Sequence, residues 1–153
     1  MSRTRARELA IQLGFASSVT GDNPQELFER FFDREHFETL SEEDPLYGKY
    51  PSEQQLDYIK RLICGVAEHR EEIDAYIRRY AKGWKLERIS KTALSVLRCA
   101  LCEILYMDDI PNAAAINEAV ELAKNYDEAD TVSFVNGVLG GFMRGELGTV
   151  PED

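Results

Sequence analysis

Apolar side chains recur along most of this chain every three or four residues, the spacing that places them on one face of an α-helix. The clearest stripe consists of Leu94, Leu97, Leu101, Ile104 and Leu105. Strict alternation of apolar and polar residues, which is typical of a half-buried β-strand, does not occur in the sequence. The pattern therefore predicts an all-α fold, a compact bundle of about seven helices.

Turn and capping residues divide this pattern into segments. Helices are predicted at about 3–19, from Pro24 to about 32, from Ser52 to about 80 as one long helix or a pair bent near Gly65, from Ser90 to about 107, and at about 113–126 and 131–144. The predicted N-caps are Asn23, Ser52, Ser90 and Asp130, because such side chains accept hydrogen bonds from the first free backbone amides. Residues 33–52 carry six acidic and two basic side chains, two prolines and a glycine, which predicts a solvated acidic loop.

The length of 153 residues is sufficient for a hydrophobic core. We expect residues 1–147 to form one domain, with an N-terminal helical part at about 1–80, a C-terminal part at about 84–147 and a frayed tail at 148–153. No run approaches the roughly 20 apolar residues that span a bilayer, and the basic start lacks the apolar core of a secretory signal. Three cysteines indicate no disulfide framework, so we expect a cytoplasmic protein.

The distribution of charge is more informative than its sum. A formal net charge of -10 argues against binding nucleic acid or acidic membranes through overall charge. However, Arg3, Arg5 and Arg7 open the chain, and residues 78–91 carry six cations against one acidic residue, with Tyr80 and Trp84 interleaved. Converging cations bind phosphates and aromatic faces stack on unpaired bases, so these groups are candidates for nucleic-acid binding; the alternative is a solvated helical face.

A second surface is predicted on the first helix. Gln12 and Phe15 share a face with Arg5 and Glu8, away from the apolar stripe of the same helix. They are therefore candidates for an exposed contact strip, and the alternative is that Phe15 extends the core.

The sequence contains no recognisable catalytic or metal-binding arrangement. His36 and His69 are isolated, and no Gly-rich phosphate loop occurs. Cys99 and Cys102 lie in the middle of a predicted helix without a second ligand pair, so we expect them to pack in the core. We expect no enzymatic activity, no cofactor and no metal.

Two further positions are unusual for a helix. The spacing of Gly137 and Gly141 indicates close packing against a neighbouring helix, and Asn117 is expected to make a buried hydrogen bond to a helix end. Both expectations concern packing rather than chemistry.

Several short motifs, in this order and spacing, resemble the transcription antitermination factor NusB family. They cover most of the chain outside residues 20–55. The motifs are Arg5-Ala-Arg-Glu with Ala10, Gln12 and Phe15; Trp84-x-Leu-x-Arg-Ile89; Leu97-Arg98 through Glu103-Ile-Leu; Asp109-Ile-Pro111; Ile116 to Lys124; and Phe134-Val-Asn-Gly-Val-Leu139. The resemblance implies an all-helical fold of two packed helical subdomains without enzymatic activity.

The resemblance also implies partners. Proteins of this family bind the boxA element of nascent RNA, best as a heterodimer with NusE, a ribosomal protein of the small subunit. The complex reaches the RNA polymerase elongation complex through other Nus factors and helps the polymerase ignore terminators in ribosomal RNA operons. Transferred to this sequence, the RNA-binding candidates are Arg3, Arg5, Arg7, Tyr80, Lys82, Lys85, Arg88, Asp130, Ser133, Phe134 and Asn136, and the partner-binding candidates are Gln12 and Phe15.

Two alternatives stay open. One is a helical protein–protein interaction module in which RNA binding is incidental, and the other is a homodimer that hides the RNA surface. An RNA methyltransferase that carries a NusB-like domain is not expected, because 153 residues leave no room for a cofactor-binding fold.

Overall fold

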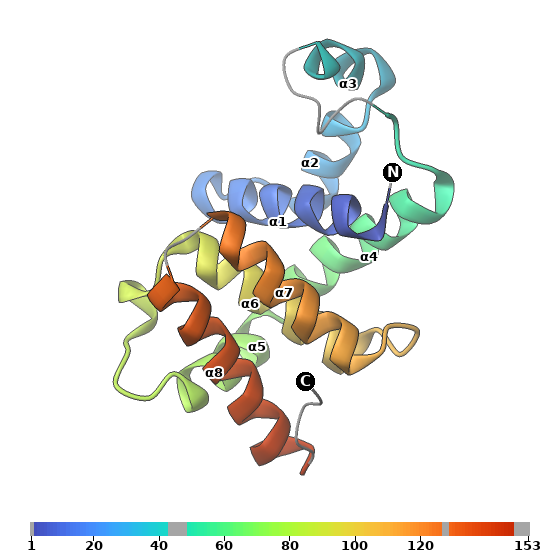
Figure 1. Ribbon diagram of the computed structural model, residues 1–153. Helices are drawn as coiled ribbons and strands as arrows, with labels where there is room; N and C mark the ends of the chain where they lie inside the picture. The colour runs from blue at the N-terminus through green and yellow to red at the C-terminus, as the bar shows by residue number, and fades with distance from the viewer. Residues whose placement is uncertain (1, 43–48, 127–128, 149–153) are drawn as a thin grey trace. The chain divides into compact units, whose positions relative to one another are not determined.

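The computed structural model describes residues 2–42, 49–126 and 129–148. Within these ranges it contains eight α-helices and no β-strand, which confirms the all-α class and adds one helix to the number predicted (Figure 1). Contacts divide the chain into two compact units, Met1–Ala67 and Glu68–Asp153, and each is described by itself. We expected the division to follow the helix at 70–80. It precedes this helix, because residues 70–80 pack on later helices of the chain.

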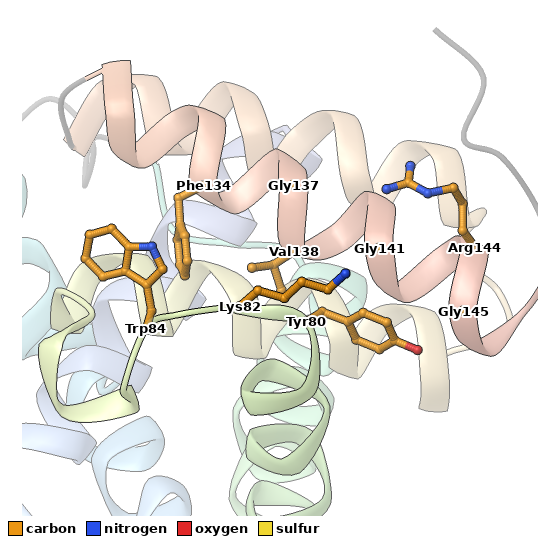
Figure 2. A pocket seen from close by; sticks show the side chains of 9 residues that line it. All are labelled: Tyr80, Lys82, Trp84, Phe134, Gly137, Val138, Gly141, Arg144 and Gly145. Atoms are coloured by element: carbon orange, nitrogen blue, oxygen red, sulfur yellow. The ribbon is translucent and has the colours of Figure 1, made fainter.

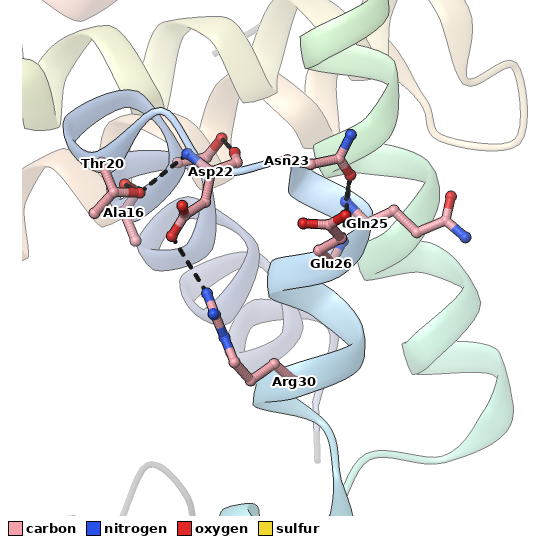
Figure 3. A network of polar contacts seen from close by, with 8 residues as sticks. Ala16, Thr20, Asp22, Asn23, Gln25, Glu26 and Arg30 are labelled. Carbon is pink, nitrogen blue, oxygen red and sulfur yellow. Dashed lines mark hydrogen bonds and ion pairs between the residues drawn. The ribbon is translucent and has the colours of Figure 1, made fainter.

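The N-terminal unit begins with α1 (Arg3–Thr20) and α2 (Pro24–Phe31). Gly21 ends α1 with a φ of 77°, a left-handed conformation that favours glycine. The Asn23 side chain then accepts hydrogen bonds from the amides of Gln25 and Glu26, at 2.9 and 3.3 Å (Figure 3). The predicted cap at Asn23 is confirmed, and the residues of this turn explain why α1 ends and α2 begins here.

The prediction of a loop over residues 33–52 was wrong for part of the segment. Residues Arg34–Ser41 form α3, and the Asp33 carboxylate accepts a hydrogen bond from the His36 amide at the start of this helix, at 3.3 Å. Phe37 is buried, with its ring centroid 5.9 Å from that of Phe32 and 5.3 Å from that of Tyr50. Burial of this ring stabilises the helix despite the acidic side chains around it. Residues 43–48 of the predicted loop lie outside the described residues.

Helix α4 (Glu53–Glu68) completes the N-terminal unit. Its start is the predicted capping box: the Ser52 amide donates to Gln55 Oε1 at 2.9 Å, and the Gln55 amide donates to Ser52 Oγ at 3.2 Å. The helix continues through Gly65 and ends before His69, so the sequence from 52 to 80 forms a pair of helices that separates four residues later than the predicted bend.

The C-terminal unit consists of α5 (Arg70–Tyr80), a 3-10 helix at Leu86–Arg88, α6 (Lys91–Tyr106), α7 (Asn112–Tyr126) and α8 (Ala129–Glu146). Helix α6 packs against α5, α7 and α8. Every residue from Ala93 to Glu103 is buried, a pattern expected of a helix that is surrounded on all sides. The cap at Ser90, which accepts from the Ala93 amide at 3.1 Å, is confirmed, and so is the core position of Cys99 and Cys102.

Two predictions about α7 and α8 were wrong. Asp130 is not the N-cap of α8, because this helix begins at Ala129 and Asp130 lies in its first turn, where an acidic side chain still matches the helix dipole. Asn117 is exposed rather than buried, since it lies on the face of α7 opposite to Ile116 and Ala119. The frayed tail predicted at 148–153 falls outside the described residues from 149 onward.

Candidate functional site

One face of α8 and the segment after α5 enclose a cavity of about 530 Å³ (Figure 2). Its walls combine three aromatic rings, two cations and three glycines. The lining residues are Tyr80, Lys82, Trp84, Phe134, Gly137, Val138, Gly141, Arg144 and Gly145. Helical periodicity explains the α8 contribution, because most of these positions follow one another at intervals of three or four residues.

Two glycines of α8, Gly141 and Gly145, make room for Tyr80 at the end of α5. A Cβ on Gly141 would lie 3.1 Å from Tyr80 Cδ1, and one on Gly145 would overlap the Tyr80 ring and hydroxyl. Nothing lies within 4 Å of the equivalent position on Gly137, which faces the open cavity. The expected close packing against a neighbouring helix was therefore wrong at Gly137 and is confirmed at Gly141, where Tyr80 of α5 approaches.

Tyr80 is held in this position by its hydroxyl. The hydroxyl donates a hydrogen bond to Glu146 Oε2, and Arg79 Nη1 donates to both oxygens of the same carboxylate, at 2.9 and 3.0 Å. The hydrogen bond to Glu146 raises the pKa of Tyr80. The same bond, together with Arg79, lowers the pKa of the Glu146 carboxyl. One wall of the cavity is thus fixed by a contact between the end of α5 and the last turn of α8.

A pair of aromatic rings forms the opposite wall. The ring centroids of Trp84 and Phe134 are 5.4 Å apart and the planes are tilted by 57°. A second cavity of about 190 Å³ lies beyond them and shares both rings with the first. It is lined by Trp84, Arg88, Ile89, Ser90, Ala93, Asp130, Thr131 and Phe134.

The tertiary structure brings together five of the predicted RNA-binding residues of this unit. Tyr80, Lys82, Arg88, Asp130 and Phe134 line one or both cavities. The other three predicted residues, Lys85, Ser133 and Asn136, are exposed and do not line either cavity.

Among the lining residues that the sequence did not indicate as site residues are Trp84 and Arg144. The sequence places Trp84 among the basic residues of the link without marking it as a site residue, but the structure leaves it 55% exposed and places it on both cavities. Arg144 had no sequence signal besides its position near the end of α8, where cations are common for reasons of helix stability alone.

The N-terminal arginines belong to the other unit and differ in exposure. Arg3 and Arg5 are exposed, whereas Arg7 retains only 6% exposure. The guanidinium carbons of Arg3 and Arg7 lie 4.5 and 5.7 Å from the ring centroid of Tyr58 on α4. An arginine as buried as Arg7 has little surface left for a phosphate, so Arg3 and Arg5 are the stronger candidates for direct contact.

The predicted partner strip is partly exposed. Phe15 is 37% exposed and Val19, one turn later on α1, is 51% exposed, while Gln12 is half-buried. The alternative in which Phe15 joins the core is therefore wrong.

Two other kinds of site are not found among the described residues. No helix in this part of the chain is long and apolar enough to cross a membrane. No group of three His, Cys, Asp or Glu side chains in it is placed to hold a metal ion.

Comparison with known proteins shows the family of this chain. The model of the NusB family matches residues 4–144. The chain belongs to the NusB family. It is 41% identical over 140 residues to the transcription antitermination protein NusB of Clostridium botulinum (strain Kyoto / Type A2), covering 92% of this chain and 98% of that relative.

Solved NusB structures share the fold. The structure of T. maritima NusB superposes with a TM-score of 0.78 at 29% identity, covering 95% of this chain and 92% of that one. A crystal structure of the antitermination factors NusB and NusE in complex with dsRNA superposes with a TM-score of 0.73 at 25% identity, covering 93% of this chain and 96% of that one. These similarities span both units of the chain.

Proposed function

We propose that this NusB-family protein is a non-catalytic transcription antitermination factor that binds boxA-type RNA together with NusE and acts in the cytoplasm. The observation that carries the proposal is the pair of adjoining cavities, in which predicted RNA-binding residues from two separate sequence regions line the same walls. The solved complex of NusB and NusE with dsRNA supports an RNA ligand and a NusE partner for this chain. Contact with the RNA polymerase elongation complex would then run through other Nus factors.

The proposal assigns different tasks to the two kinds of residue. Lys82, Arg88, Arg3 and Arg5 neutralise phosphates, which sets affinity and its salt dependence. Phe134 provides an aromatic face for an unpaired base, and Tyr80 forms the wall beside it. Since the family model spans residues 4–144, we treat residues 1–147 as one functional domain to which both units contribute.

Fluorescence anisotropy with a boxA-like RNA and a scrambled RNA, each with and without NusE, tests this function. We expect tighter binding of the boxA-like RNA and a further gain in affinity when NusE is present. Equal affinity for the two RNAs in the presence of NusE would contradict the proposal. Charge reversal at Arg5 should reduce the slope of the logarithm of the RNA-binding constant against the logarithm of salt concentration by an amount equal to about one phosphate contact.

The exposed Phe15 and Val19 favour a second candidate function, a protein–protein interaction module in which RNA binding is incidental. The double change Arg3→Glu and Arg5→Glu discriminates between the two. Under the main proposal it abolishes RNA binding, spares NusE binding and stops antitermination, whereas under the alternative antitermination survives. A light-scattering mass at several protein concentrations separates a monomer from a homodimer.

A further inference from the structure

Trp84 is the only tryptophan of the sequence, and it is not packed in the core. Its side chain is 55% exposed, more than any other large apolar side chain that is described. Phe134 covers part of the indole, but the 57° tilt between the planes leaves another part uncovered. Exposure of so much apolar surface on a ring that also carries a hydrogen-bond donor is typical of a contact residue.

The backbone that carries Trp84 is fixed by a turn. The Trp84 amide donates to the carbonyl of Ala81 at 3.0 Å, and Gly83 between them has a φ of 80°. Ala81 before this turn and Ile89 after the following 3-10 helix are both buried. The turn is therefore anchored on both sides, so little backbone conformational entropy is lost when a ligand meets the exposed ring.

Trp84 also borders both cavities, and each cavity has its own cation. Lys82 lines the larger cavity and Arg88 the smaller one. Both side chains are exposed, and neither forms an ion pair with another described residue. One exposed cation in each of the two cavities that Trp84 borders matches single-stranded RNA, in which charged phosphates alternate with flat bases.

We propose that Trp84 is a base-stacking residue between two nucleotide sites, so that one base of a single-stranded RNA lies on each side of the Trp84–Phe134 pair. The inference rests on the proposed RNA-binding function. It adds Trp84 to the RNA-binding residues and specifies the course of the RNA strand past this ring. Lys82 and Arg88 contact the phosphates that flank the stacked bases. Every base has a π-face, so this stacking tightens binding without strong sequence preference.

Intrinsic fluorescence tests the proposal on the unmodified protein, because all tryptophan emission comes from Trp84. We expect a single-stranded boxA-like RNA to quench this emission, with a midpoint equal to that of the anisotropy titration. Replacing one nucleotide at a time by an abasic one should weaken the quenching at two neighbouring positions and not elsewhere. RNA binding that leaves the emission unchanged would overturn the proposal.

Substitutions separate stacking from simple apolar cover. Trp84→Leu retains apolar surface but has no π-face, and should lower RNA affinity by about 10- to 100-fold, whereas Trp84→Phe should stay close to the unmodified protein. Leu147→Ala is the matched control, because it removes another exposed apolar side chain of the same unit, and it should not change RNA affinity. Circular dichroism must show that each variant is folded.

The outcomes distinguish this inference from the proposed function. If the unmodified protein fails to bind boxA-like RNA with and without NusE, both fail. If it binds, and Trp84→Leu binds equally well, only the stacking role of Trp84 is wrong. Loss of NusE binding in Trp84→Leu with unchanged RNA affinity would likewise overturn it, and would place Trp84 in a protein interface instead.

Discussion

Arg98 on α6 donates two hydrogen bonds to the carboxylate of Asp74 on α5, from Nε to Oδ1 at 2.8 Å and from Nη2 to Oδ2 at 3.0 Å. The two side chains are only 10% and 11% exposed. Arg70, one turn before Asp74, has a pKa that is lowered by burial and then by the charge of Arg98, while Asp74 acts in the opposite direction. Asp74 therefore compensates the positive charge of two arginines inside the C-terminal unit.

Asp74→Ala should destabilise this unit severely. Removal of one partner leaves the buried Arg98 without its counter-ion, which costs about 3–5 kcal/mol of unfolding free energy. Urea denaturation followed by circular dichroism measures the change. Asp57→Ala is the control, because the Asp57–Arg61 pair is exposed and its loss should cost about 0.5 kcal/mol or less. Similar losses for the two variants would contradict the prediction.

The contact between Tyr80 and Glu146 predicts two opposite pH effects. The folded pKa of Glu146 is lowered, so its contribution to stability is present above the unfolded pKa of the carboxyl and is lost as the pH falls through the folded value. The folded pKa of Tyr80 is raised, so its contribution is present below the unfolded pKa of the phenol and is lost as the pH rises through the folded value.

Glu146→Ala should therefore lower the phenolate midpoint of Tyr80 and reduce the loss of melting temperature in acid. Ultraviolet absorbance monitors the phenolate, and Tyr80→Phe identifies which transition belongs to this residue. Glu121→Ala serves as the control, because Glu121 pairs with Lys124 on the surface of α7, away from the tyrosine. An unchanged Tyr80 midpoint in Glu146→Ala would show that the carboxylate does not hold the ring.

Two glycines of α8 should respond in opposite directions to alanine. Gly137→Ala adds a side chain to open space and should stabilise the helix by up to about 1 kcal/mol. Gly145→Ala must displace Tyr80 from its place beside Glu146, and the overpacking cost of about 1–3 kcal/mol should exceed the gain in helix propensity. Thermal unfolding of the two variants compares them directly, and equal stability would argue against the close approach of Tyr80.

The buried ring of Phe37 should contribute strongly to the free energy of unfolding, although it lies on the short helix α3. Phe37→Ala should cost about 3–5 kcal/mol of unfolding free energy, because α3 is attached through this ring. His36→Ala changes the neighbouring exposed position and should have little effect. A loss in Phe37→Ala as small as that in His36→Ala would indicate that residues 34–41 behave as the solvated loop that the charges suggest.

The features that the sequence predicted correctly depend on residues a few positions apart. The caps at Asn23, Ser52 and Ser90 each form a hydrogen bond that spans two or three residues. The helical stripes and the core position of Cys99 and Cys102 follow from periodicity and composition alone. The resemblance to the NusB family likewise rests on short motifs, and the family model confirms it.

The remaining features depend on partners far away in the sequence, and only the tertiary structure decided them. Tyr80 and Glu146 are 66 positions apart, yet their contact places the Tyr80 ring where a side chain at position 145 would overlap it. The charged and loop-forming residues of 34–41 predicted a loop. The segment is instead helical, because Phe37 packs on aromatic rings from other parts of the chain, and a local sequence pattern does not reveal such contacts.

The same limit applies to the site. From the sequence alone, Trp84 and Phe134 are an aromatic residue in a basic link and one in a late helix. The sequence by itself determined most of the helices, the caps at Asn23, Ser52 and Ser90, and the family, because these are properties of neighbouring residues. The tertiary structure decided which side chains share a cavity, because hydrophobic burial brings together residues that the chain order keeps apart.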